Sequence, residues 1–230
     1  MTQFRWWPAP RLFVAALLAS LAVLAGAAPA QLRPVPAADD ADLAAGWAAY
    51  QARDLTAALS HFRRAAERGQ RVAQFNLAVM LIDGEGTAPN PAEALAWLRR
   101  AADNGMARAQ YALGILYEQG RLLPRSLVDA TSWYAKAAAQ GWRDAQVAVA
   151  TQYYLGRGVA REYAMAAHWY GKAAEQGDAG AAYILASMYE RGDGVARDFD
   201  RAWRWYVEAS AGGDPAARIK AEELAARLRR

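Results

Sequence analysis

The chain of 230 residues contains no cysteine and only two histidines. Without cysteine it can form neither a disulfide framework nor a thiolate metal site. It also lacks the local patterns that often accompany catalysis: there is no nucleophile elbow, no phosphate-binding glycine loop and no metal-ligand spacing. These absences favour a protein that is not an enzyme, with no catalytic residue and no bound metal or cofactor.

Charge of one sign is not in large excess either. The net charge at pH 7 is +4, and it falls to +2 when residues 1–30, which hold two arginines and no acids, are removed. Such a small surplus gives no reason to expect a nucleic-acid partner. Hydrophobic residues are abundant, at 55% of the chain, and many of them are alanine. Because alanine favours helices and adds little to a sheet core, we expect an all-α fold.

Residues 1–30 have the pattern of a bacterial export signal. Two arginines precede an apolar run over residues 12–26, and Ala28-Pro29-Ala30 supplies small side chains for cleavage before Gln31. The run of 15 residues is shorter than the roughly 20 that a spanning helix needs. An uncleaved anchor is the alternative. We predict an exported protein, periplasmic or secreted, with no stable membrane insertion after cleavage.

Residues 31–42, which include Pro34, Pro36 and three aspartates, are expected to form a flexible linker. Everything after them is periodic. Two glycine series and one tryptophan series share a step of 36 residues: Gly69, Gly105, Gly141, Gly177 and Gly213; Gly84, Gly120, Gly156 and Gly192; Trp97, Trp133, Trp169 and Trp205. A fixed period between about 20 and 50 residues is typical of a solenoid, so residues 43–230 are predicted to form one.

Each repeat is predicted to be a pair of helices. In the first helix Ala73, Leu77 and Leu81 form an apolar stripe that ends before Gly84. The segment Asn90-Pro91-Ala92-Glu93 then has the pattern of a capping box that opens a second helix.

The phrase WYGKAAEQG at 169–177 nearly repeats WYAKAAAQG at 133–141. We expect Trp169 and Tyr170 to fill the space between helices, while the alanines that follow allow a neighbouring helix to approach closely. Gly177 then turns the chain into the next repeat.

The pattern AxxxLGxLYxxGxGVxxDxxxAxxWYxKAAEQG, seen in residues 145–177 and 181–213, resembles the Sel-1-like repeat family. This family is related to the tetratricopeptide repeats, and the resemblance implies a right-handed α/α superhelical solenoid of helical hairpins. It predicts an N-terminal cap unit at 46–69 that resembles a tetratricopeptide unit, repeats at 70–105, 106–141, 142–177 and 178–213, and a C-terminal capping helix at 214–230. Leu122 replaces the second loop glycine, so we expect its loop to take a different conformation.

The resemblance also implies a function. Proteins of this family are superhelical scaffolds that bind proteins or peptides in a concave groove, often in bacterial envelope or signalling complexes. An enzyme is the alternative, because some cysteine-rich secreted members hydrolyse or bind β-lactams. Those members hold their repeats together with disulfides, which this chain cannot form.

His61 and His168 lie about three repeats apart. At roughly 10 Å for each packed helix layer they are too distant to share a metal, so we expect both to be structural or surface residues.

The residues that a partner would touch are expected on the first helix of each repeat, on a stripe about 100° from the packing stripe. The sequence varies along this stripe, whereas the packing positions stay similar. The candidate partner-binding residues are Phe75, Val79, Tyr111, Ile115, Glu118, Tyr154, Tyr183 and Glu190. Aromatic residues often dominate interface energetics, so the aromatic members are the expected anchors. The alternative is that they pack between adjacent helices.

Overall fold

The computed structural model describes residues 40–229, so the predicted signal peptide and most of the predicted linker lie outside the described residues. Within this range the chain forms eleven helices and no strand, which confirms the all-α prediction. The helices are α2 (Asp40–Gln51), α3 (Leu55–Glu67), α4 (Arg71–Asp83), α5 (Pro91–Asp103), α6 (Ala107–Gln119), α7 (Leu127–Ala139), α8 (Arg143–Leu155), α9 (Tyr163–Glu175), α10 (Ala179–Arg191), α11 (Phe199–Ala211) and α12 (Pro215–Leu228). None of those between residues 40 and 229 has both the length and the apolar character that a bilayer span requires.

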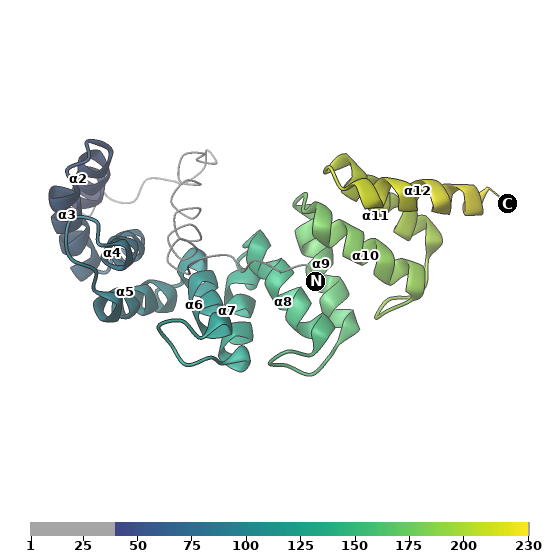
Figure 1. The fold of residues 1–230 in the computed structure, drawn as a ribbon, viewed down its shortest axis with the longest axis horizontal. Coiled ribbons are helices and arrows are strands. Elements are labelled where there is room, and N and C mark those ends of the chain that lie inside the picture. Colours follow the sequence, from purple (N-terminus) through teal and green to yellow (C-terminus); the bar gives the residue numbers. More distant parts are fainter. Residues whose placement is uncertain (1–39, 230) are drawn as a thin grey trace, which may run out of the picture. The chain divides into compact units, whose positions relative to one another are not determined.

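The chain divides into two compact units between Trp97 and Leu98, within α5. We call them unit 1 and unit 2. In unit 2 each helix from α6 to α12 packs against the next one along the chain, and Figure 1 shows this succession from teal to yellow. This arrangement is the predicted solenoid of helical hairpins.

The last three residues of the predicted linker, 40–42, belong instead to α2 of unit 1. Asp42 explains the difference. Its carboxylate accepts hydrogen bonds from Arg64 at 2.9 Å and Arg68 at 2.6 Å, and it lies 2.9 Å from Nδ1 of His61. The hydrogen bonds to Arg64, His61 and Arg68 hold the pKa of Asp42 well below its usual range. A residue that looked like part of a linker therefore joins α2 to α3.

The turn inside each hairpin of unit 2 is built in the same way. The first helix ends at a glycine in the left-handed conformation, with φ of +69° at Gly120, +68° at Gly156 and +83° at Gly192. The backbone N–H at the start of the second helix then donates to a carbonyl near the end of the first. These bonds run from Ser126 to Tyr117 at 3.0 Å, from Glu162 to Tyr153 at 3.0 Å and from Asp198 to Tyr189 at 2.9 Å.

The capping box predicted in unit 1 differs from the expected form in one bond. The N–H of Glu93 donates to Oδ1 of Asn90 at 3.2 Å, as expected. The Glu93 carboxylate, however, accepts from the side-chain amide of Asn90 at 3.1 Å. The backbone N–H of Asn90, which the Glu93 carboxylate would accept in a capping box, donates instead to the carbonyl of Leu81 at 2.8 Å, across the hairpin.

The loop that contains Leu122 does not take the different conformation that we expected. Leu122 has φ of +59°, in the same left-handed region as Gly158 at +74° and Gly194 at +71°. Its side chain is 47% exposed. The loop geometry therefore outweighs the preference of leucine for negative φ.

We predict that Leu122→Gly raises the free energy of unfolding by about 0.5–1 kcal/mol. A leucine in the left-handed conformation carries a strain of about 1–2 kcal/mol, which glycine would remove. Glycine also has greater conformational freedom in the unfolded chain, and this offsets about half of the gain in stability. Urea unfolding measures the change. Leu155→Gly is the control, because Leu155 is equally exposed, at 45%, but lies in α8. The Leu155→Gly variant should be less stable than the parent protein. A lower free energy of unfolding in both variants would contradict the strain at Leu122.

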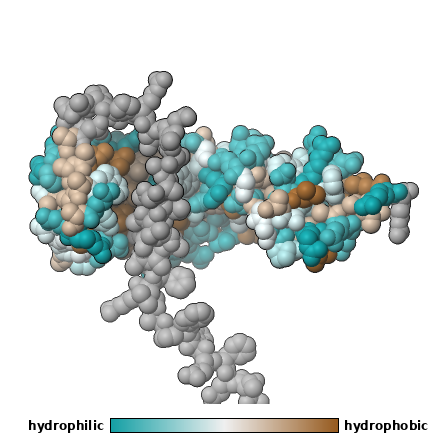
Figure 2. All heavy atoms as spheres, turned by 90° about the horizontal axis from the view of Figure 1, so that it is seen from above, coloured by the Kyte–Doolittle hydropathy of each residue, from teal (hydrophilic) through white to brown (hydrophobic). Residues whose placement is uncertain are grey.

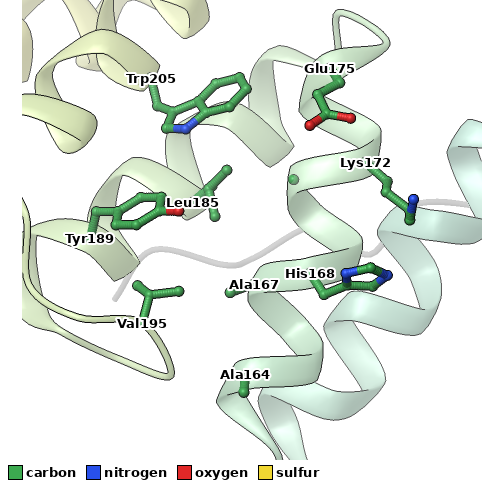
Figure 3. A pocket seen from close by; sticks show the side chains of 10 residues that line it. Ala164, Ala167, His168, Lys172, Glu175, Leu185, Tyr189, Val195 and Trp205 are labelled. Atoms are coloured by element: carbon green, nitrogen blue, oxygen red, sulfur yellow. The ribbon is translucent and has the colours of Figure 1, made fainter.

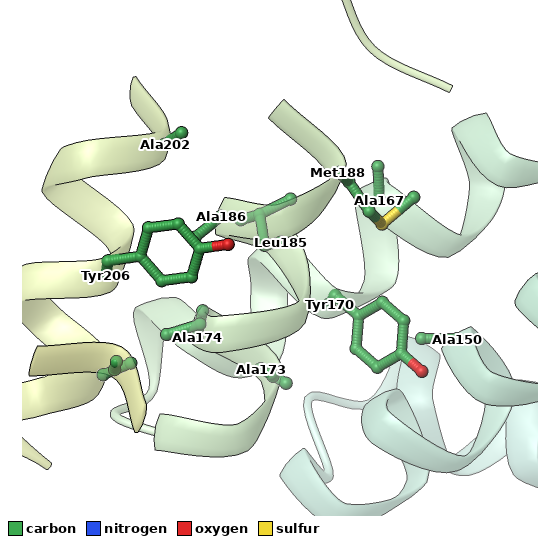
Figure 4. Close-up of a cluster of buried hydrophobic side chains, with 14 of the residues drawn as sticks. Ala150, Ala167, Tyr170, Ala173, Ala174, Leu185, Ala186, Met188, Ala202 and Tyr206 are labelled. Carbon is green, nitrogen blue, oxygen red and sulfur yellow. The ribbon is translucent and has the colours of Figure 1, made fainter. Parts of the chain in front are cut away.

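The core of unit 2 is made largely of alanine and tyrosine. Tyr134, Tyr170 and Tyr206 recur every 36 residues and are only 1–2% exposed. Figure 4 shows Tyr170 reaching toward Ala150 and Tyr206 lying beside Ala186. The preceding tryptophans, Trp133, Trp169 and Trp205, are only half-buried. The tyrosine therefore fills the space between helices, and the tryptophan packs at its edge.

A column of buried glutamines, which the sequence analysis did not single out, joins consecutive repeats. The side-chain amide of Gln110 donates to the carbonyl of Ala102 at 3.0 Å, and that of Gln146 to Ala138 at 3.3 Å. In unit 1, Gln74 makes the same bond to Ala66 at 3.1 Å. Gln140 and Gln176 extend the column by donating to Gln110 and Gln146, both at 2.7 Å. These bonds satisfy polar groups that would otherwise be costly to bury.

Candidate functional site

Six of the predicted binding residues lie in unit 2, and we call them the first-helix stripe: Tyr111, Ile115 and Glu118 on α6, Tyr154 on α8, and Tyr183 and Glu190 on α10. All six are half-buried, so each leaves part of its side chain accessible. The other two candidates lie on α4 of unit 1. Val79 is half-buried, but Phe75 is only 3% exposed. Phe75 is therefore a core residue, and its prediction as an accessible anchor was wrong.

The three stripe tyrosines both pack and remain accessible. The Tyr111 ring lies 5.6 Å from that of Tyr134, and the Tyr183 ring 5.3 Å from that of Tyr206. Tyr154 lies 6.4 Å from Tyr170 and 5.3 Å from Tyr163, edge to face in both cases. Each ring is thus held against the second helix of its hairpin, which reduces the conformational entropy that a bound partner would have to remove.

The hydroxyl of Tyr111 is a neutral hydrogen-bond donor. Burial, together with the nearby negative charges of Asp144 and Glu118, raises the pKa of Tyr111 to about 12. The phenol therefore stays protonated at any physiological pH. It can donate to a carbonyl or carboxylate of a ligand.

The two glutamates of the stripe have structural partners that the sequence did not reveal. Glu118 accepts the hydroxyl of Tyr134 at 2.7 Å and the amide of Gln152 at 3.0 Å, and it lies 3.4 Å from Arg157. Glu190 accepts the hydroxyl of Tyr206 at 2.8 Å. Burial raises the pKa of both tyrosines, and the hydrogen bonds to these carboxylates raise it further. Glu118 and Glu190 therefore act as acceptors for hydroxyls of the core.

The histidines have local partners. His61 interacts with Asp42 in unit 1, and the His168 ring packs edge to face against Trp169 in unit 2, with 5.1 Å between ring centres. Between residues 40 and 229 there is no cluster of three or more metal-ligating side chains that could hold a metal ion.

An additional groove lies in unit 2 on the side of the second helices, where the sequence predicted no site. It has a volume of about 420 Å³, and Figure 3 shows Tyr189, Val195 and Trp205 facing α9 across it. Gly171 lies on the α9 side. A Cβ at this glycine would lie 3.8 Å from Leu185, an ordinary contact, so packing does not require glycine here.

Comparison with protein families accounts for the repeats. The Sel1 repeat model matches residues 43–70, 71–106, 107–142, 143–178 and 179–214. The chain belongs to the Sel1 repeat family. The boundaries of the last four matched repeats fall one residue later than those we predicted. Residues 43–70, where we expected a tetratricopeptide-like cap, match as a further Sel1 repeat.

Two solved structures of Sel1 repeat proteins are similar to this one. The first is c5321, a protective antigen present in uropathogenic Escherichia coli strains, with 35% identity over 81% of this chain and a TM-score of 0.73. The match spans only 41% of the length of c5321, so the present chain corresponds to less than half of that protein. The second is a Sel1 repeat protein from Oxalobacter formigenes, with 31% identity, coverage of 77% of this chain and 73% of that one, and a TM-score of 0.71. None of the curated proteins compared with the chain matches it.

The comparisons support a general role. Sel1 repeats commonly serve as scaffolds for protein interactions, and the chain consists mainly of such repeats. The fold itself carries no information about which protein is bound.

Proposed function

We propose that this protein is a non-enzymatic scaffold of the bacterial cell envelope that binds a protein or peptide on the first-helix stripe of unit 2. One observation carries the proposal. Three successive first helices, α6, α8 and α10, each present a half-buried tyrosine that is fixed by an aromatic contact. Rigid aromatic anchors on a rigid framework are typical of interface hot spots.

Three further features support the proposal. The varied residues around the tyrosines, such as Ile115, would give specificity for one partner, whereas the Tyr134 and Tyr170 positions are kept for packing. The export-signal pattern of residues 1–30 supports the envelope location. The absence of cysteine argues against the β-lactam alternative.

Tyr183→Ala and Tyr111→Ala test the stripe. The partner is first captured by crosslinking in intact envelopes and identified, and its affinity for each purified variant is then measured. We expect each variant to raise the Kd at least about tenfold, because a truncated anchor commonly loses 1.4 kcal/mol or more. Both residues also touch core tyrosines, so circular dichroism must confirm that each variant is folded at the temperature of the binding measurement.

His168→Ala is the matched control for these variants. It removes another ring from unit 2, outside the stripe, and should leave the affinity unchanged. An unchanged Kd in folded Tyr111 and Tyr183 variants would show that the stripe is not the binding surface.

A further inference from the structure

The large hydrophobic residues that are exposed between residues 40 and 229 fall into two groups. One group lies on α11 and α12, where Figure 2 shows hydrophobic atoms among hydrophilic ones, at the right: Trp203, Val207, Ile219 and Leu228. The other group lies at two consecutive hairpin loops of unit 2 and consists of Leu122, Val128 and Leu155. Their exposed fractions are 47%, 66% and 45%.

The repeat does not require large apolar side chains at the three loop positions. Leu122 stands where the next two hairpin loops have glycine, and Leu155 stands where α10 has Arg191. Val128 stands where α9 has Ala164. Since the equivalent positions are glycine, charged or small, packing of the hairpins does not explain the choice of leucine and valine here.

Leu122 is the most informative of the three. Its φ of +59° is a strained conformation for leucine, which the glycines of the next two loops adopt without cost. The side chain is exposed, so no burial in the core compensates for the strain. Strained backbone that packing does not explain is typical of functional positions.

The two loops lie next to one another. A Cβ at Gly158 in the second loop would lie 2.8 Å from the backbone nitrogen of Val128, just after the first loop. The hydroxyl of Thr131 on α7 also donates to the carbonyl of Arg157 in the second loop at 3.3 Å. Figure 1 shows the α6–α7 and α8–α9 loops along one edge of unit 2, below the helices. We call residues 120–128 and 155–162 the loop edge.

The loop edge carries an excess of arginine. Residues 120–126 contain two arginines and no acid, and residues 156–162 contain two arginines and one acid. The corresponding residues of the third loop, 192–198, contain one arginine and two aspartates. Arginines still outnumber acids at the loop edge when the flanking Glu118 and Asp129 are counted. The positive excess thus occurs at the two loops that carry the exposed leucines.

Most of these arginines are not neutralised. Arg157 lies 3.4 Å from the carboxylate of Glu118, whereas Arg125 donates only to the backbone carbonyl of Glu118, at 3.0 Å. Within the described part of the chain, Arg121 and Arg161 have no ion-pair partner. Their guanidinium groups are therefore available to phosphate, which they can bind through two parallel hydrogen bonds.

We propose that the loop edge binds the surface of a membrane that contains anionic lipids. The arginines contact lipid phosphates, and Leu122, Val128 and Leu155 enter the headgroup region. The binding is peripheral and reversible, because three aliphatic side chains bury too little apolar area to anchor a protein permanently. It would hold the solenoid by one edge and leave the first-helix stripe free for a protein partner.

The shape of the surface favours a bilayer over an acidic protein. The apolar side chains lie on loops and at helix ends that form an edge, rather than in a groove. The headgroup region of a bilayer can surround separate protruding side chains, whereas a protein partner must supply a matching hollow for each of them.

A fluorescent label at one chosen position can test the proposal, because the chain has no cysteine of its own. Ala160→Cys in the second loop and Ala216→Cys in the first turn of α12 are each labelled with an environment-sensitive fluorophore. Both alanines are exposed. The full chain is titrated with vesicles of phosphatidylcholine, alone or with about one third phosphatidylglycerol. We expect the label at residue 160 to shift to shorter wavelength with the anionic vesicles only, and the label at residue 216 to stay unchanged.

Leu122→Gly, made in the chain labelled at residue 160, should weaken binding to the anionic vesicles about fivefold. We expect this variant to be more stable than the parent, so unfolding cannot account for the loss. Val207→Ala is the matched control, because Val207 is 40% exposed on α11, outside the loop edge. It should leave binding unchanged, and so should Tyr111→Ala, which separates this proposal from the previous one.

Replacing Arg121 and Arg161 together with glutamine should weaken vesicle binding at least about tenfold. The matched control replaces Arg204 and Arg218, two exposed arginines of α11 and α12, and removes the same charge. It should have a much smaller effect. Circular dichroism confirms that all these variants are folded.

Three results would overturn the proposal. The first is an unresponsive label at residue 160, which would show that lipid is not the partner of the loop edge. The second is an equal response of the labels at residues 160 and 216, and the third is equal weakening by the two pairs of arginine substitutions. Either of these would mean that vesicles attract the chain through its general charge.

Discussion

Replacing Tyr170 with alanine is expected to lower the free energy of unfolding by about 3–5 kcal/mol, as large aromatic truncations in protein cores do. The ring is 2% exposed and lies in the cluster shared by α8, α9 and α10. Its hydroxyl lies 2.9 Å from that of Thr151. The substitution would leave a cavity at the point where two repeats meet, and urea unfolding monitored by circular dichroism measures the loss.

Trp169→Ala is the matched control, because it removes the adjacent and larger ring. Trp169 is only half-buried, so its loss should cost about half as much or less. The sequence alone suggested that both rings fill the core. Equal losses at the two positions would show that the tryptophan contributes as much as the tyrosine, contrary to the burial pattern.

The second large effect is expected from Gly158→Ala, which should destabilise the protein by about 2–5 kcal/mol. Alanine at φ of +74° carries a strain of about 1–2 kcal/mol. In addition, its Cβ would lie 2.2 Å from the carbonyl oxygen of Leu127, in the first turn of α7. The backbone must shift to relieve this contact, and overpacking of this kind typically costs about 1–3 kcal/mol.

Gly141→Ala separates strain from contact. Gly141 also has positive φ, at +86°, but a Cβ there would meet no atom within 4 Å. We expect a loss of only about 1 kcal/mol, from conformation alone. If the two variants lost the same stability in urea unfolding, the loop of Gly158 would not be packed against the preceding repeat as the structure shows.

The helical hairpins could be predicted because their signals are local and repeated. Gly84 and Gly120 mark the ends of first helices, and the capping pattern at residues 90–93 marks the start of a second one. Glycine is the residue that takes positive φ without strain, so its spacing reports backbone conformation directly. Leu122 shows the limit of this reasoning, because a loop fixed by its neighbours imposed the glycine conformation on a leucine.

The environment of side chains was harder to predict, because it depends on the neighbouring helix. Trp169 and Tyr170 are adjacent in sequence and point about 100° apart on α9, so the apolar pattern could not decide which one faces inward. The repeat position of Glu118 varies between repeats, as we expected of a binding position. Its carboxylate nevertheless accepts a hydrogen bond from the buried hydroxyl of Tyr134. Phe75 occupies the same stripe position as Tyr111 but is buried. Only the packed structure distinguishes an exposed position from a buried one.

The exposure of Trp203 on α11 could not have been predicted from hydrophobicity alone. Trp203 follows the same helical spacing as core residues, and in a sequence an exposed apolar residue looks like a buried one. The 36-residue step nevertheless held a usable signal. Trp203 and Val207 stand where the preceding repeat has Ala167 and Gly171, and they are 36% and 40% exposed.

The glutamine column has a consequence for folding cooperativity. Gln74, Gln110 and Gln146 each tie a first helix to the carbonyl of the preceding second helix, but the fourth position is Ala182, which has no amide to donate. The coupling between adjacent repeats is therefore weaker where α10 joins α9. The stability of a repeat protein is approximately the sum of the intrinsic stabilities of its repeats and of the interactions between neighbours. We therefore expect α10 to α12 to open by local unfolding more often than the helices before them.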